Sequence, residues 1–284
     1  LNCNVYNYGD KDTMSAPPYN HGVHGFRTMS SHQYDLIVIG SGPAGEKGAA
    51  QAAYFSKKVA LIECEKGLGG AAANTGTLPS KTLRETALYL SGFRQRGLFG
   101  VNMTFKESVT ARDFLFREKL VQETENRRIE GNLDRHKVTV FHGMASLVDQ
   151  HTVRLEKQEG GSELLAAKVL LIATGSRPFR PAVFPFDDSR VYDSDTILNL
   201  HDIPQEMLVV GGGVIGCEYA CMFAALGIRV TLLEGRAQLL TFLDPEVADL
   251  LTRNMIEMGV NIRFSETVTS VQPGPEQIQA TLAS

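Results

Sequence analysis

The sequence lacks the features of several large protein classes. Basic residues are not in excess: 28 Lys and Arg stand against 32 Asp and Glu, which gives a formal net charge of −4. Binding along a nucleic acid needs a basic surface, so no nucleic-acid partner is expected. Apolar runs are also short, and the longest, residues 217–233, is interrupted by Glu218 and Arg229. A membrane-spanning helix needs about 18 apolar residues, so no membrane partner is expected either.

Cysteine is scarce as well. The four cysteines are Cys3, Cys64, Cys217 and Cys221, and their spacing forms neither a secreted disulfide framework nor the paired pairs of a metal site. We therefore predict a soluble cytoplasmic protein with no bound metal. Hydrophobic residues make up 43% of the 284 residues, which is enough apolar mass for buried cores in about two domains.

Residues 1–29 differ in composition from the rest of the chain. Tyr, Asn, Gly, His and Ser dominate, and no periodic apolar pattern appears. We interpret this segment as a disordered leader or translated upstream sequence. An organelle-targeting segment is the alternative, but such segments are rich in Arg and poor in acids. Here Arg27 is the only arginine, and Asp10 and Asp12 are present.

A phosphate-binding pattern begins after residue 34. Residues 35–39 are apolar and β-branched, which is typical of a strand buried on both faces, and residues up to 55 read as a helix. The turn between them has the glycine spacing of a dinucleotide loop and consists of Gly40, Ser41, Gly42, Pro43, Ala44 and Gly45. A second strand, residues 58–62, ends at Glu63, where an acid can accept a hydrogen bond from a ribose hydroxyl.

Glycine-rich turns are common, so the spacing alone is weak evidence. A tight turn without a ligand is the alternative interpretation. The context favours a dinucleotide site, because the loop follows a strand, opens a helix and precedes a strand that ends in an acid.

The same pattern occurs a second time. Residues 207–210 read as a strand, the helix extends to 226, and a further strand, residues 229–233, ends at Glu234. The loop residues expected to contact a nucleotide are Gly211, Gly213, Val214, Ile215 and Gly216. The distance from Gly40 to Glu63 is 23 positions, and so is the distance from Gly211 to Glu234. Shared glycine and acid spacing predicts two dinucleotide sites.

The residues of the second site do not decide between NAD and NADP. Glu234 favours NAD, because a carboxylate repels a 2′-phosphate. Arg236 lies two residues later, and its guanidinium could bind the 2′-phosphate of NADP. An exposed turn arginine is an equally good interpretation of Arg236.

Further motifs resemble one flavoprotein family. Residues 69–81 read GGAAANTGTLPSK, residues 173–175 read ATG between the two loops, and Glu218 follows the second loop. This combination resembles the class I pyridine nucleotide-disulfide oxidoreductases, which include dihydrolipoamide dehydrogenase, glutathione reductase and the soluble transhydrogenases. The resemblance implies that the first loop and Glu63 hold FAD and that the second loop holds NAD or NADP.

The resemblance also implies roles for individual residues. Lys81 is expected beside the flavin, paired with Glu218, as the catalytic residues; an exposed helix lysine and a solvated helix acid are the alternatives. The other residues implied at the FAD site are Cys64, Gly69, Gly70, Ala71, Ala72, Gly143, Ala173, Thr174 and Gly175. Cys217 and Cys221 are one helical turn apart and are expected to pack in the core.

Two departures from the family decide the expected activity. Disulfide reductases carry cysteines where this chain has Ala72 and Thr77, and thiol–disulfide exchange requires a thiolate. The transhydrogenase branch also has Thr at the second position, although it usually keeps the first cysteine. We therefore expect hydride transfer between NADPH and NAD through FAD. A dihydrolipoamide dehydrogenase-like reductase and an inactive nucleotide-binding fragment are the alternatives.

The predicted fold class is α/β, with two Rossmann-like three-layer dinucleotide-binding domains. Residues 30–178 are assigned to the first segment of the FAD domain and residues 179–284 to the NAD(P) domain. The family continues with a second FAD-contacting segment and a dimerisation domain. We therefore expect the chain to be incomplete at its C-terminal end, with a homodimer formed by the full-length family member.

Overall fold

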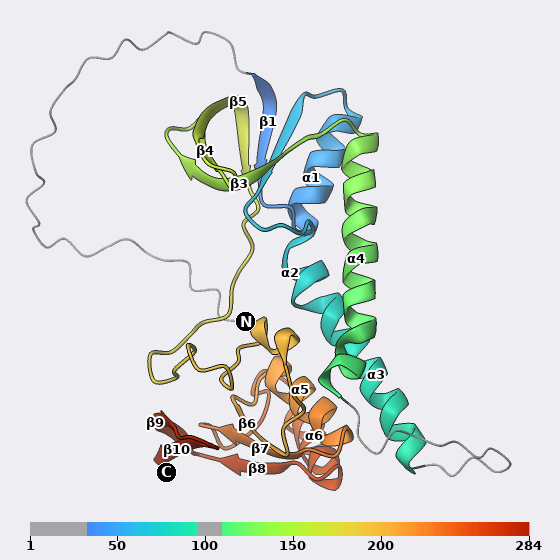
Figure 1. The fold of residues 1–284 in the computed structure, drawn as a ribbon, viewed down its shortest axis with the longest axis vertical. Helices are drawn as coiled ribbons and strands as arrows, with labels where there is room; N and C mark the ends of the chain where they lie inside the picture. Colours follow the sequence, from blue (N-terminus) through green and yellow to red (C-terminus); the bar gives the residue numbers. More distant parts are fainter. Residues whose placement is uncertain (1–32, 96–109, 284) are drawn as a thin grey trace, which may run out of the picture. The chain divides into compact units, whose positions relative to one another are not determined.

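The computed structural model describes residues 33–95 and 110–283, and the predicted leader, residues 1–29, lies outside them. Two regions of regular structure follow one another along the chain (Figure 1). We call β1–β5 with α1–α4 the first lobe and β6–β10 with α5 and α6 the second lobe. The first lobe contains the strands β1 (Tyr34–Ile39), β2 (Val59–Glu63), β3 (Thr139–Leu147), β4 (Thr152–Lys157) and β5 (Ser162–Ile172).

The strand β1 lies at the centre of the first sheet. It pairs in parallel with β2 on one side and with β5 on the other, so that Ile37 lies opposite Ala60 and Leu170. β3 extends the parallel sheet next to β2, and β4 pairs antiparallel with both β3 and β5, which closes the ring of pairings. β3 and β4 were not among the predicted strands.

Both faces of the first sheet are buried. Val38 and Leu61 pack on the side that contacts the helices, in a cluster with Ile129. Ile37 and Ile62 point to the other side, in a cluster with Leu155 and Leu165 from β4 and β5. This double burial accounts for the continuous apolar composition of β1 and β2.

Four helices belong to the first lobe: α1 (Pro43–Tyr54), α2 (Gly70–Asn74), α3 (Thr77–Gln95) and α4 (Ala111–Arg135). The helix predicted to follow the first loop is confirmed as α1. The long helix α4 was not predicted. It begins with a capping box in which Thr110 and Asp113 satisfy each other's backbone N–H groups.

The second lobe repeats the strand–loop–helix unit. Its elements are β6 (Glu206–Val210), α5 (Val214–Ala225), β7 (Arg229–Glu234), α6 (Pro245–Glu257), β8 (Asn261–Phe264), β9 (Thr267–Pro273) and β10 (Ile278–Ala283), preceded by a 3-10 turn at Thr196–Asn199. β6, β7 and β8 form a parallel sheet in that order, and β9 and β10 form an antiparallel hairpin. The helix and strands predicted for this unit are confirmed, whereas the hairpin was not predicted.

The two lobes are joined by side-chain packing in one apolar cluster. Leu83 of α3 and Phe114 of α4 belong to the same cluster as Phe223 of α5, and the rings of Phe114 and Phe223 lie 6.0 Å apart. Both lobes combine parallel strands with helices, which confirms the α/β fold class. The predicted domain boundary, residue 178, falls in the connection between β5 and β6. Within the described residues, no helix combines the length and the apolar character needed to cross a bilayer.

Candidate dinucleotide-binding sites

The first glycine loop lies between β1 and α1 and is tied to the end of β2. Both the backbone N–H and the hydroxyl of Ser41 donate to Oε2 of Glu63, at 2.8 and 2.6 Å. The Ser41 hydroxyl in turn accepts from the N–H of Gly69 at 2.9 Å. Three segments that the sequence predicts to share a site are therefore hydrogen-bonded to one another.

The glycines of this loop differ in what surrounds them. A Cβ at Gly45 would collide with the carbonyl oxygen of Gly40, and a Cβ at Gly40 would collide with that of Ala173. Protein packing thus explains both glycines. At Gly42 no protein atom lies within 4 Å of the Cβ position. The open space beside Gly42, at the start of α1, fits a pyrophosphate at a helix N-terminus.

Glu63 is held as a carboxylate. Its residue surface is 5% exposed. Burial alone would raise the pKa of Glu63, but hydrogen bonds from Ser41, Glu65 and Cys64 hold this pKa below its usual value. The pKa of the Cys64 thiol is shifted in the opposite direction, because burial and the neighbouring carboxylate of Glu63 raise it. Cys64 is therefore a weak nucleophile.

Further predicted residues of the first site lie next to this loop or on the strand beside β2. Gly70 is in contact with Gly42, because a Cβ at Gly70 would lie 2.9 Å from the Gly42 Cα. The ATG turn approaches from β5, where the Ala173 N–H donates to the Ile39 carbonyl at 2.8 Å. Gly143 follows His142, the residue of β3 that pairs with Glu63.

Residues of α4 support the first site and were missed by the sequence reasoning. Asn126 donates to Oδ1 of Asn74 at 2.9 Å, and Asn74 donates to the carbonyls of Leu68 and Gly70. These bonds fix the glycine-rich segment against α4. The available sequence signal was the capping-box spacing at the start of α4.

Glu46, in the first turn of α1, is also held by α4. It is 3% exposed, accepts from Asn132 Nδ2 at 2.8 Å, and forms ion pairs with Lys47 at 3.2 Å and Arg128 at 3.5 Å. A buried carboxylate requires such partners. Glu46 therefore fixes the start of α1, where the loop ends, relative to α4.

The second glycine loop, between β6 and α5, has the same arrangement. The N–H of Gly212 donates to Oε2 of Glu234 at 2.7 Å, and the N–H of Arg236 donates to Oε1 at 2.9 Å. A Cβ at Gly216 would collide with the carbonyl oxygen of Gly211, whereas no protein atom lies within 4 Å of the Cβ position of Gly213. The space beside Gly213 again fits a pyrophosphate.

Lys81 and Glu218 lie on α3 and α5, two helices in contact with each other. Both side chains are exposed. Within the described part of the chain, no ion pair joins Lys81 to Glu218. Their pairing beside a flavin stays a prediction.

The cysteines of the described residues are free and form no redox pair. Burial raises the pKa of Cys217 to about 11, and burial also raises the pKa of Cys221. Both pack in the core of the second lobe, as expected. Ala72 and Thr77 bring no thiol to the start of α3.

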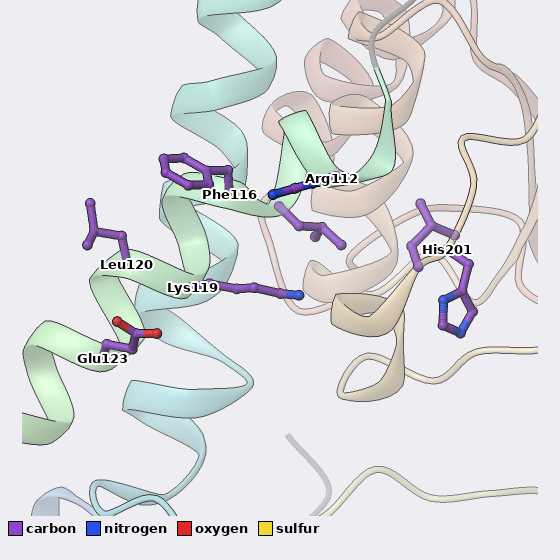
Figure 2. Close-up of a pocket in the computed structure, with 8 residues that line it drawn as sticks. Arg112, Phe116, Lys119, Leu120, Glu123 and His201 are labelled. Atoms are coloured by element: carbon purple, nitrogen blue, oxygen red, sulfur yellow. The ribbon is translucent and has the colours of Figure 1, made fainter.

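A separate surface hollow of about 470 Å³ runs along the first half of α4. Figure 2 shows Arg112, Phe116 and Lys119 of α4 on one side and His201 on the other. None of the predicted site residues lines it, so we do not assign it to either dinucleotide.

Comparison with known proteins agrees with this geometry. Residues 34–284 match the family of pyridine nucleotide-disulphide oxidoreductases. The chain therefore belongs to this family.

Within this family, the chain is similar to enzymes named soluble pyridine nucleotide transhydrogenase. The chain is 45% identical over 253 residues to the soluble pyridine nucleotide transhydrogenase of Mycobacterium bovis, covering 89% of this chain and 54% of that relative. It is 40% identical over 254 residues to the enzyme of the same name from Colwellia psychrerythraea, again covering 89% and 54%. The chain spans about half the length of these relatives.

A solved structure has the same fold. The copper(II) complex of the HOCl-induced flavoprotein disulfide reductase RclA from Escherichia coli matches with a TM-score of 0.77 and 28% identity, over 88% of this chain and 53% of that chain. The family predicted from the sequence motifs is thus confirmed.

Proposed function

We propose that the chain forms the dinucleotide-binding part of an FAD-dependent oxidoreductase that transfers hydride between NADPH and NAD. One combination of features carries the proposal. In both loops a backbone N–H donates to the glutamate at the end of the next strand, an arrangement that we call the acid clamp. The same chain has Ala72 and Thr77 where disulfide reductases have thiols. The names of the curated relatives support the same activity.

The first lobe would hold FAD. The Ser41–Glu63 clamp fixes the loop, and the open backbone at Gly42 admits the pyrophosphate at the start of α1. The Gly69–Gly70 segment and the ATG turn complete the site from two other segments. When bound, the flavin supplies the hydride acceptor and donor, which no side chain can supply.

The second lobe would hold the nicotinamide nucleotide. Glu234 fixes its loop through the N–H of Gly212, and the open backbone at Gly213 admits the pyrophosphate. Lys81 would place a positive charge beside the flavin, where it stabilises negative charge that develops on reduction. Glu218 would orient Lys81.

Two measurements test the proposal. The purified protein is expected to be yellow and to transfer hydride from NADPH to a chromogenic NAD analogue. A colourless and inactive protein would contradict it and favour a nucleotide-binding fragment without activity. Release of thiol from oxidised lipoamide would instead support the disulfide reductase.

The role of Lys81 is tested separately by stopped-flow reduction of the Lys81→Met variant with NADPH. We expect slower flavin reduction, because the charge beside the flavin is lost. Reduction at the parent rate would show that Lys81 does not act there.

A further inference from the structure

The surface hollow along the first half of α4 is used by neither of the proposed dinucleotide sites. Most of its lining residues belong to α4, and the other two, Leu200 and His201, follow the 3-10 turn before β6. Its volume of about 470 Å³ lies in the range of small-molecule sites and is too small for a macromolecular partner. The side chains around it therefore decide which small ligand it can hold.

Part of this lining is apolar. Leu115 and Leu200 are buried members of the cluster that joins the two lobes, and they form the base of the hollow. Phe116 and Leu120 lie one helical turn apart on α4 and are 66% and 51% exposed. The apolar body of a ligand placed here would remove these two side chains from water, which favours binding.

The rest of the lining is mainly cationic. Figure 2 shows Lys119 extending from α4 toward the side of the hollow on which His201 lies. Within residues 33–95 and 110–283, neither Arg112 nor Lys119 forms an ion pair. The acid of the lining, Glu123, is one helical turn beyond Lys119 and does not pair with it either. Two formal positive charges thus face the hollow against one negative charge, and the ring of His201 adds a hydrogen-bond donor.

This combination of side chains selects among classes of ligand. A neutral apolar molecule would cover Lys119 without giving its ammonium a partner, which costs binding free energy. An inorganic anion would pair with Lys119 but would leave Phe116 and Leu120 in water. A nucleoside would need polar groups opposite the edge of its base, and Glu123 is the acceptor side chain that the lining supplies. A ligand with an anionic head and an aliphatic body satisfies both parts of the lining.

We propose that the hollow along α4 binds an anionic amphiphile, a small molecule with a carboxylate or phosphate head and an aliphatic body. The head contacts Lys119 through a charge-assisted hydrogen bond, with His201 opposite as a second donor. The body lies against Phe116 and Leu120. Because none of these residues belongs to the glycine loops, this site is independent of the proposed function.

The test is calorimetric titration of the full chain with octanoate and, separately, with octyl phosphate, in the presence of saturating FAD and NAD. We expect both amphiphiles to bind, and octanol and inorganic phosphate to bind at least about 10-fold more weakly, because each carries one half of the ligand. Lys119→Gln should weaken octanoate binding about 10-fold. Leu120→Ser should weaken it about 3- to 10-fold through lost apolar contact.

Lys137→Gln is the matched control. Lys137 is an exposed lysine directly after α4, has no ion pair among the described residues and does not line the hollow. Octanoate affinity should be the same in this variant as in the parent. An equal loss in Lys137→Gln and Lys119→Gln would show that net charge attracts the anion, and would overturn the proposal.

Other outcomes would also overturn it. One is the absence of binding by both amphiphiles, and another is octanol binding as tightly as octanoate. Self-association of the chain that Phe116→Ser abolishes in sedimentation velocity would assign the hollow to a second copy instead. All of these results leave the proposed function intact, because FAD and NAD binding is measured separately in the same variants.

Discussion

Glu63 and Glu234 hold corresponding positions in the two copies of one structural unit, yet their surroundings differ. Glu63 is buried and accepts from the backbone and the hydroxyl of Ser41. Glu234 is half-buried and accepts from the backbone of Gly212, which has no side chain. The enclosed acid and the additional hydrogen bond of the first unit support the proposal that this unit holds a resident cofactor. The second unit keeps the same clamp but leaves the acid accessible, which suits a nucleotide that is exchanged.

The sheets that carry the two acids also differ in burial, and the sheet of the first unit is again the more buried one. Ile37 and Leu208 are equivalent residues of β1 and β6, but Ile37 is fully buried and Leu208 is 43% exposed. β4 and β5 cover Ile37, whereas α5 and α6 pack on the opposite face of β6. The first unit is therefore covered on both faces, and the described part of the second unit on one.

The largest effect is expected from substitution of the third loop glycine, which both units share. Gly45→Ala should destabilise the fold by about 3 kcal/mol or more, because its Cβ meets the Gly40 carbonyl, which cannot move without disrupting the loop. Gly216→Ala should do the same against Gly211. Urea unfolding measures both. Gly131→Ala on α4 is the control, because nothing lies within 4 Å of its Cβ position; unchanged stability in Gly45→Ala would contradict the packing argument.

The second glycine of each loop should respond differently. Gly42→Ala is expected to leave the free energy of unfolding of the flavin-free protein nearly unchanged, since its Cβ would enter open space. Flavin affinity should fall by at least about 10-fold, because the added methyl occupies the approach of the pyrophosphate. Flavin content after dialysis measures this. Full retention of flavin would show that the open space is not the phosphate site.

These glycines show which features could be predicted from the sequence. The strand before each loop, the helix after it and the acid 23 positions on are local in sequence, so their spacing predicted two sites and the fold class. The contact between Asn126 and Asn74 spans 52 positions. No periodic pattern indicates it, because α4 carries many charged residues and its buried positions are sparse between Leu115 and Ile129. Tertiary hydrogen bonds of this kind become visible only once the helices are packed.

A smaller effect on the free energy of unfolding is expected when Glu63 or Glu234 is replaced, and its size should differ between the two acids. Glu63→Gln should lower the free energy of unfolding by about 2 kcal/mol, because a buried carboxylate that accepts several hydrogen bonds is replaced by an amide that must donate. Glu234→Gln should cost about 1 kcal/mol, since Glu234 is half-buried and has fewer donors. Equal costs for the two substitutions, measured in urea at neutral pH, would remove the proposed distinction.

The pH dependence of the Glu63 contribution has a defined sign. Its pKa in the folded protein lies below the usual value of 4.5, so the folded state binds fewer protons than the unfolded state in the range between the two. The stabilisation is fully present above pH 4.5 and is lost as the pH falls through the folded pKa. The stability difference between the parent and Glu63→Gln should therefore shrink only in acid; a constant difference across that range would contradict the assignment.

The smallest effect is expected at Leu208 of β6, and comparison with Ile37 of β1 tests whether β6 is covered on one face only. Ile37→Ala should cost about 3 kcal/mol, because it leaves a cavity between the first sheet and β4 and β5. Leu208→Ala at the equivalent position should change the free energy of unfolding by no more than about 0.5 kcal/mol, because this side chain is 43% exposed. A cost at Leu208 close to that at Ile37 would mean that β6 is covered on its second face in solution. The second lobe would then be as enclosed as the first, and accessibility would no longer support the proposal that Glu234 serves a nucleotide that is exchanged.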